Sequence, residues 1–108
     1  MGKFEIKKDK AGKFRFNLKA SNGQVVLSSE GYNSKSACEN GIASVQKNCS
    51  NDNCFERTTA SNGKPRFNLK STNGQVIGTS QMYSSNSAME NGISSVKKNA
   101  PKAAVVEL

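Results

Sequence analysis

Basic and amide side chains alternate along two short stretches of this chain, and this is the pattern with the clearest chemical use. Side chains at every second position of a β-strand project from the same side of a sheet. A row of Lys, Arg and Asn suits contacts with phosphate oxygens, because it supplies both positive charge and hydrogen-bond donors. The eight candidate residues for binding a polyanion are Lys13, Arg15, Asn17 and Lys19 together with Lys64, Arg66, Asn68 and Lys70.

An ordinary solvated surface explains the same residues. Glu5 and Glu56 lie in neighbouring predicted strands, where they would face Arg15 and Arg66 across the sheet. Exposed ion pairs of this kind contribute little to stability. Sheets that bind nucleic acids usually also expose aromatic rings for base stacking, whereas the phenylalanines here alternate onto the opposite, apolar side. The hypothesis of a binding face therefore rests on charge.

No pattern indicates catalysis or metal binding. The chain contains no histidine, and its three cysteines, Cys38, Cys49 and Cys54, show no Cys-x-x-Cys spacing, which argues against a zinc site. A cysteine nucleophile usually needs a neighbouring base, and Cys38 falls on an apolar stripe where it would pack as a small hydrophobic residue. We therefore expect a non-enzymatic protein with no cofactor and no metal. We expect three reduced thiols, and a Cys49–Cys54 disulfide formed after extraction is the alternative.

The composition is strongly basic. Sixteen Lys and Arg against eight Asp and Glu give a net charge of +8 for 108 residues. Such an excess attracts anionic partners such as nucleic acid, and it also keeps a small protein soluble. No apolar run approaches the roughly 18–20 residues that span a membrane, and the N-terminus lacks the apolar segment of a secretory signal. We expect a cytoplasmic protein without membrane contact.

The strands that would carry these rows are indicated by alternating apolar and polar residues. Residues 4–7 and 14–19 show the period of a half-buried strand. A register that pairs Phe4 with Phe16 would place both rings in the core. Asn22-Gly23 then predicts a hairpin with a type I′ turn that leads into a third strand.

Helical spacing of apolar residues follows in both parts of the chain. The first helix is predicted from an N-cap at Ser34 or Ser36 to about Asn48, and the second over about residues 85–99. The apolar stripes consist of Cys38, Ile42, Val45 and Cys49 in the first helix and of Met89, Ile93 and Val96 in the second.

The whole arrangement is written twice. Lys13–Val25 recurs as Lys64–Val76, and more than half of the positions in 4–48 and 55–99 are identical. A unit of about fifty residues buries too little surface to be more than marginally stable alone. We therefore expect one domain over residues 1–108, in which a first unit (1–51) and a second unit (52–108) share one core.

A proline and two glycines predict an unusual backbone. Pro65 cannot donate a hydrogen bond to a neighbouring strand, which predicts a sheet edge or a bulge. Gly41 and Gly92 recur inside the two helices, where glycine costs about 1 kcal/mol relative to alanine. They predict close approach of each helix to another backbone. The second copy further differs from the first at Arg57, in place of Ile6, and at Gly78, in place of Leu27.

Several motifs resemble those of the YegP-like family of small bacterial proteins. They are the Asn-Gly-Gln-Val turn, the Tyr-x-Ser-x-x-Ala-x-Glu-Asn-Gly-Ile stretch at Tyr32–Ile42 and Tyr83–Ile93, and the closing SVKKNAP. The resemblance covers essentially the whole chain. It implies an α+β fold in which tandem β-β-β-α-β repeats form one antiparallel sheet with exchanged C-terminal strands and two helices on one face. Phe55–Thr58 would serve both units as a strand, and Val105–Leu108 would close the other half. It carries over no catalytic or binding residues.

Two functional hypotheses follow. In the first, the polar sheet face of a small basic module binds nucleic acid or another polyanion with little sequence preference. In the second, the chain is a protein-interaction or stress-accessory module that is recognised through sheet edges or helix faces, and its charge serves solubility. Because two units are already fused in one chain, we expect a monomer in either case.

Overall fold

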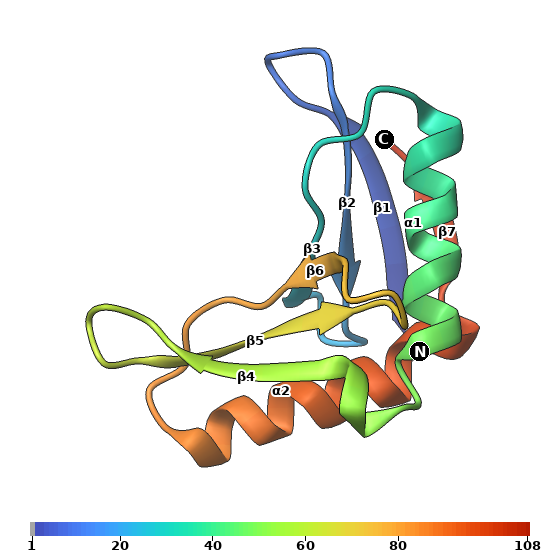
Figure 1. The fold of residues 1–108 in the computed structure, drawn as a ribbon. Helices are drawn as coiled ribbons and strands as arrows, with labels where there is room; N and C mark the ends of the chain where they lie inside the picture. Colours follow the sequence, from blue (N-terminus) through green and yellow to red (C-terminus); the bar gives the residue numbers. More distant parts are fainter. Residues whose placement is uncertain (1) are drawn as a thin grey trace.

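The strands form a single sheet, and two amphipathic helices pack against it (Figure 1). The computed structural model describes residues 2–108. The first half of the chain holds β1 (Lys3–Lys8), β2 (Phe14–Lys19), β3 (Val25–Ser28) and α1 (Lys35–Asn48). A short 3-10 helix, η1 (Asp52–Cys54), leads into the second half, which holds β4 (Phe55–Thr59), β5 (Pro65–Lys70), β6 (Val76–Thr79), α2 (Asn86–Asn99), a second 3-10 helix η2 (Ala100–Lys102) and β7 (Ala104–Glu107).

The sheet is mixed, and the expectation of an antiparallel sheet is wrong at one edge. The strand order is β4-β5-β6-β3-β2-β1-β7. All neighbours are antiparallel except β1 and β7, which run parallel with Phe4 beside Val105 and Ile6 beside Glu107. The last strand of the chain, β7, therefore completes the sheet of the first half. It follows η2 directly and runs parallel to β1.

The register between β1 and β2 differs by two residues from the prediction. Phe4 lies opposite Leu18 rather than Phe16, and Glu5 lies opposite Asn17. A shift of two leaves every side chain on its predicted face, because successive side chains alternate. Phe4, Phe16 and Leu18 are accordingly all fully buried.

The turn between β2 and β3 is not of type I′. That turn needs positive φ at two residues, whereas Gly23 has a φ of 85° and no described residue other than glycine has a positive φ. The Gly23 N–H donates to the Ala20 carbonyl over 2.9 Å. The turn is therefore a type I turn followed by a glycine bulge, the usual form of a longer hairpin loop.

Both helices begin where a serine caps the first turn. The Ser34 hydroxyl accepts a hydrogen bond from the Ala37 N–H over 3.0 Å, and the Ser85 hydroxyl accepts one from Ala88 over 3.1 Å. Between the two predicted N-caps of α1, the structure therefore selects Ser34. Neither α1 nor α2, the longest helices of residues 2–108, has the length and apolar composition of a membrane span. Every residue of the two predicted apolar stripes is buried.

The helix glycines make room for tyrosine rings, so the expected close approach to a backbone is wrong. A Cβ atom at Gly41 would overlap the Tyr32 hydroxyl, and one at Gly92 would overlap the Tyr83 hydroxyl. Tyr83 in turn stacks on Phe67, with ring centroids 6.3 Å apart. Glycine at these positions lets each helix lie flat on an aromatic pair.

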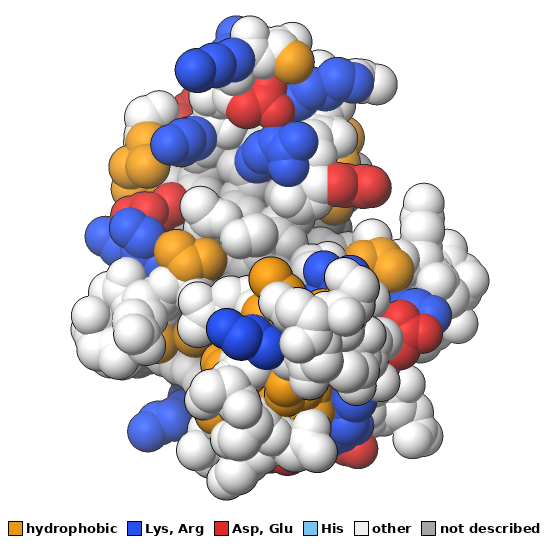
Figure 2. Space-filling view, turned by 90° about the vertical axis from the view of Figure 1, so that its left-hand side faces the viewer, with side chains coloured by type: hydrophobic (Ala, Val, Ile, Leu, Met, Phe, Trp, Pro, Cys, Tyr) orange, Lys and Arg blue, Asp and Glu red, His pale blue; other side chains and the backbone are white. Residues whose placement is uncertain are grey.

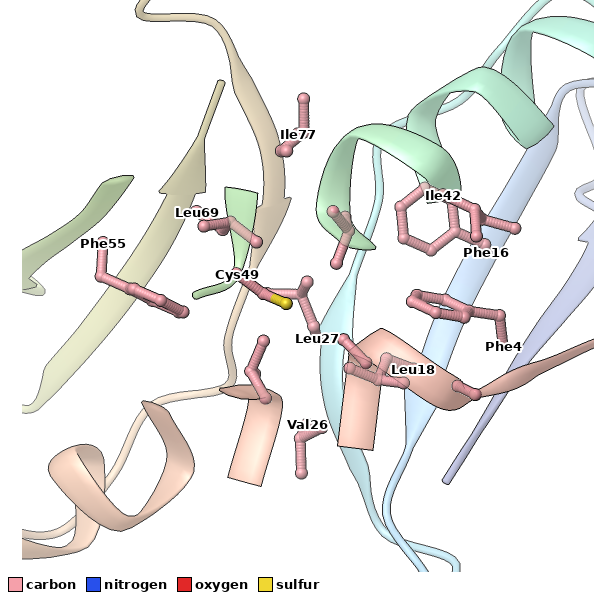
Figure 3. Packing of buried hydrophobic residues seen from close by; sticks show 14 of the residues in the cluster. Phe4, Phe16, Leu18, Val26, Leu27, Ile42, Cys49, Phe55, Leu69 and Ile77 are labelled. Carbon is pink, nitrogen blue, oxygen red and sulfur yellow. The ribbon is translucent and has the colours of Figure 1, made fainter. Parts of the chain in front are cut away.

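The two halves pack into one hydrophobic cluster (Figure 3). Leu27 and Cys49 lie at its centre, between Phe55 and Leu69 on one side and Phe16 on the other. The helices cross the junction, since α1 contacts β5 and β6 while α2 contacts β3. The apolar sides of both halves thus form a common interior.

The start of the second half departs from expectation in two ways. Phe55–Thr58 belongs to β4, which within residues 2–108 pairs with β5 alone, so it does not also close the sheet of the first half. Pro65 lies in the inner strand β5 rather than at an edge, but as its first residue. Its carbonyl accepts a hydrogen bond from Tyr83, whereas Phe14 both donates to and accepts from Tyr32.

Expression of residues 1–51 alone tests the prediction of one shared domain. This segment lacks β7, β6 and α2, so its apolar face would stay exposed, and we expect no cooperative unfolding transition in urea. The full chain should unfold in one transition that coincides for circular dichroism and tyrosine fluorescence. A stable, cooperatively folded monomer of residues 1–51 would contradict the prediction.

The Gly92→Ala substitution should destabilise the protein although alanine is the better helix former. The added methyl group must displace Tyr83, at a cost of roughly 1–3 kcal/mol for an overpacked core. Urea denaturation provides the measurement. Ser94→Ala, on the exposed side of α2, is the matched control and should be neutral or slightly stabilising. A gain in stability for Gly92→Ala would show that the ring is not held there.

Candidate polyanion-binding face

The sheet face opposite the helices carries the predicted basic rows. In Figure 1, α1 lies along the right-hand side of the molecule and α2 along its lower side. Figure 2 shows Lys and Arg side chains among acidic and uncharged ones on the left-hand side of that view. We call the polar face the set of eight basic side chains, Lys3, Lys7, Lys13, Arg15, Lys19, Lys64, Arg66 and Lys70, with the acidic Glu5, Asp9 and Glu56. Its surplus of five positive charges is most of the net +8 of the chain.

The structure places the predicted residues in two rows rather than one patch. Arg15, Asn17 and Lys19 follow β2, while Arg66 and Lys70 follow β5 with Asn68 between them. β3 and β6 lie between these strands, so the rows are separated by two strands, and Figure 1 shows β2 running upright and β5 running across the view. A linear polyanion could cross both rows, whereas a single small anion could not.

The first row is largely neutralised by its own carboxylates. Lys19 Nζ lies 2.9 Å and Lys3 Nζ 3.2 Å from the Glu5 carboxylate, whose side chain is only 10% exposed. Hydrogen bonds from Lys19 and then Lys3 hold the pKa of Glu5 below its ordinary value, against the opposing effect of desolvation. The expected pairing of Glu5 with Arg15 is wrong, because the register sets Glu5 opposite Asn17.

Arg15 is paired with an aspartate of the preceding turn. Its Nε donates to Asp9 Oδ2 over 2.7 Å, and this bond lowers the pKa of Asp9. Lys13 Nζ donates to the Asn33 amide oxygen over 2.6 Å. Asn17 accepts a hydrogen bond from the hydroxyl of Ser28. These hydrogen-bond partners, Asp9, Asn33 and Ser28, all lie in turns or strands next to β2.

The second row keeps more of its charge available. Lys70 Nζ lies 2.9 Å from Glu56, and Asn68 donates to the same carboxylate over 3.2 Å. These hydrogen bonds, that of Lys70 first, lower the pKa of Glu56. The expected pairing of Glu56 with Arg66 is wrong. Arg66 and Lys64 are exposed and form no ion pair within residues 2–108.

A difference between the two sequence copies explains why Arg66 forms no ion pair within residues 2–108. Ala60 occupies the position that corresponds to Asp9, so the carboxylate that binds Arg15 has no counterpart near Arg66. The second half therefore offers the less neutralised part of the polar face.

Two further basic residues of the face were missed by the sequence analysis. Lys3 and Lys7 alternate with Phe4 and Ile6 in β1 and share the face of Glu5. The sequence contained the information that places Lys7 on this face, because β1 alternates as β2 does. In the structure Lys7 lies directly opposite Arg15.

The hollows of the surface do not define a site for a small anion. One hollow of about 250 Å³ lies between the halves and is lined by uncharged residues, among them Asn22, Gln81, Tyr83 and Asn91. Lys70 lines a second hollow of about 310 Å³ together with uncharged loop residues. A third hollow of about 240 Å³ is lined by Lys7 and Lys8, but also by the carboxylate-bearing Glu107. The remainder of the polar face is an open surface.

The described residues bring together no other reactive constellation. Within residues 2–108, no group of three or more His, Cys, Asp or Glu is close enough to hold a metal ion. Cys38, Cys49 and Cys54 are buried and free. Burial raises the pKa of the Cys38 and Cys49 thiols, which disfavours the thiolate that a nucleophile or metal ligand requires.

Known proteins share both the sequence and the fold of this chain. A domain of unknown function, DUF1508, matches it twice, at residues 9–56 and 60–107. A UPF0339 protein in the ptx operon 5′ region of Stutzerimonas stutzeri is 55% identical over 107 residues, which cover 99% of this chain and 96% of the relative. The UPF0339 protein YegP of Escherichia coli is 52% identical over 98 residues, covering 91% and 89%.

Two solution NMR structures have the same architecture. The structure of YegP from Escherichia coli, described as a protein of unknown function, has a TM-score of 0.94 at 49% identity and covers 98% of this chain and 91% of its own. The UPF0339 protein SO3888 of Shewanella oneidensis has a TM-score of 0.94 at 48% identity and covers 99% and 91%. The chain therefore belongs to the DUF1508 family, that of YegP and the other UPF0339 proteins.

Proposed function

We propose that the polar face binds polyanions, nucleic acid among them, weakly and with little sequence preference. One observation carries the proposal: the face uncovered by helices holds eight basic and three acidic side chains, which is most of the positive excess of the chain. Contacts of Lys and Arg with a phosphate or sulfate backbone need charge and reach rather than a pocket. An open, two-row surface meets that requirement.

The binding is expected to depend mainly on the second row. Lys19, Arg15 and Lys70 are already held by carboxylates, so they can engage a new anion only by sharing or exchanging a partner. Arg66 and Lys64 have no such competitor within residues 2–108. No phenylalanine is exposed on the face, and hydrogen bonds and charge rather than base stacking would provide the affinity.

A protein-interaction role is the second candidate, and the open edges of the sheet favour it. β4 and β7 end the strand order and present unpaired backbone groups. Three of the five large apolar side chains that are exposed within residues 2–108 lie on or next to β7, namely Val105, Val106 and Leu108.

Arg66→Gln tests the proposed face directly. A fluorescent single-stranded DNA is titrated at several salt concentrations, and the wild-type affinity should fall steeply with salt because counterions are released. Loss of one phosphate contact should reduce the magnitude of the slope of log affinity against log salt by about 0.7, the value for single strands.

The control for this substitution is Lys98→Gln on the exposed side of α2, which changes the net charge equally on another face. It should leave the slope nearly unchanged. Equal effects of the two variants would mean that net charge alone attracts the DNA, and absence of binding at low salt would refute the proposal.

Glu56→Gln should strengthen binding, since it removes a competing carboxylate and releases Lys70. Lowering the pH has the same effect, because protonation of Glu56 frees Lys70. Hydrogen bonds from Lys70 and Asn68 lower the pKa of Glu56, so this protonation occurs below the ordinary pKa of a glutamate. Titration with a sulfated polysaccharide, whose charge persists in acid, provides the measurement. The wild type should bind more tightly as the pH falls, and the variant should show less of this change.

Glu39→Gln, an equal charge change on the exposed side of α1, is the matched control. If it strengthens binding at neutral pH as much as Glu56→Gln does, the carboxylate on the polar face has no specific role.

A further inference from the structure

The edge strand β7 shows how this fold binds an extended segment. β7 lies parallel to β1, and the Leu108 N–H donates to the Ile6 carbonyl over 2.8 Å. Gln46 on α1 donates to the carbonyls of Ala100 and Ala103, which guides the chain onto the edge. At the far end, Lys35 Nζ lies 2.7 Å from Glu107. An edge strand, a neighbouring helix and one ion pair therefore suffice to hold this segment.

The second half has the corresponding edge, but nothing occupies it. β4 occupies the place in its half that β1 has in the first, and within residues 2–108 it pairs with β5 alone. Arg57 lies opposite Phe67, whose N–H donates to the Ser80 hydroxyl and whose carbonyl accepts from the Ser80 N–H, both on the β6 side. Arg57 therefore directs its own N–H and carbonyl away from β5, toward the open edge. Ile6 uses the same two groups to face β7.

The side chain at this edge selects the charge of an occupant. In the register of β1 with β7, Ile6 lies beside Glu107. The same register on β4 would set an acidic residue beside Arg57. Arg57 is one-third exposed. Its Nε and Nη2 donate to Glu90 over 2.5 and 3.0 Å, and Nη2 also donates to Asp52 over 3.1 Å. Nη1 donates to none of these carboxylates, so Arg57 can engage a further carboxylate through Nη1 by sharing its charge with Glu90 and Asp52.

We propose that the β4 edge binds an extended segment of another protein as a parallel strand, with β-branched apolar residues ahead of an acidic residue that pairs with Arg57. The pattern is that of Ala104–Glu107, which docks on the equivalent edge of the first half. Addition of a strand to an open edge is a common mode of peptide recognition. A second copy of this chain is not the occupant, because its own segment of this kind is held on β1 by Gln46 and Lys35.

The probe is the capped heptapeptide Lys-Ala-Ala-Val-Val-Glu-Leu, added to isotope-labelled full-length protein and followed by NMR. We expect shift changes at residues 54–59 and at the facing part of α2, at peptide concentrations up to about 1 mM. Replacing the second valine of the peptide by proline should abolish these changes, because the corresponding residue, Val106, directs its N–H toward the neighbouring strand, as Leu108 does.

Two variants distinguish the contribution of the Arg57 charge to peptide binding from that of the β4 backbone hydrogen bonds. Arg57→Gln should weaken binding roughly threefold, as expected for a partly exposed ion pair, and changing the peptide glutamate to glutamine should then cause no further loss. Arg57→Pro removes the guanidinium and, in addition, an N–H that faces solvent, so compared with Arg57→Gln it should retain the fold and no longer bind the peptide. Lys98→Gln, on the exposed side of α2, should bind like the wild type.

Several results would overturn the proposal. Shift changes at residues 3–8 with loss of the β7 signals would mean that the peptide displaces β7 instead. Unchanged spectra, or full binding by Arg57→Pro, would exclude the β4 edge. Concentration-dependent dimers that Arg57→Pro abolishes would show that a second copy occupies this edge.

Discussion

The structure depends on one constraint: two halves must fill a common interior across a junction with almost no backbone pairing. β3 and β6 share a single register pair, Ser28 with Thr79. Side chains must therefore join the halves. Leu27 fills the space above Gly78, where a Cβ atom would lie 2.6 Å from its Cδ2. Leucine in both copies would place two side chains in the same volume, so the glycine of the second copy is a packing requirement.

The same constraint determines which surface is available for binding. Each helix crosses onto strands of the other half to seal the common interior, so both are used on one sheet face. Neither helix covers the opposite face, whose side chains are mostly polar, although Val76 beside Lys70 is exposed. Lysine and arginine fill these positions, and Glu5, buried beneath Lys3 and Lys19, compensates part of their repulsion. The remaining charge is a consequence of architecture that a polyanion can exploit.

The sequence allowed the two helices and the sides of the strands to be predicted, because periods of 3.6 and 2 residues map directly onto buried faces. It did not determine register, since a slip of two residues satisfies the same alternation, as for Phe4 beside Leu18. Asn22-Gly23 is compatible with two hairpin turns, and only the backbone bonds distinguish them. The candidate residues were placed on the right face, but their partners were not. Asp9 lies in a turn, where the alternation of strand residues does not predict which side chains come within hydrogen-bond distance.

Differences between the sequence copies are most informative where their surroundings differ. Ile6 is fully buried in β1 beside β7, whereas Arg57 at the corresponding position lies on an open edge. Gln46 guides β7, and Lys97 in its place binds Asp52 beside β4. An inward-pointing charge is a common protection of an edge strand against unspecific pairing, since an apolar partner would have to desolvate it. The same charge favours a strand that brings a carboxylate, so protection of the edge and selection of its partner have one physical cause.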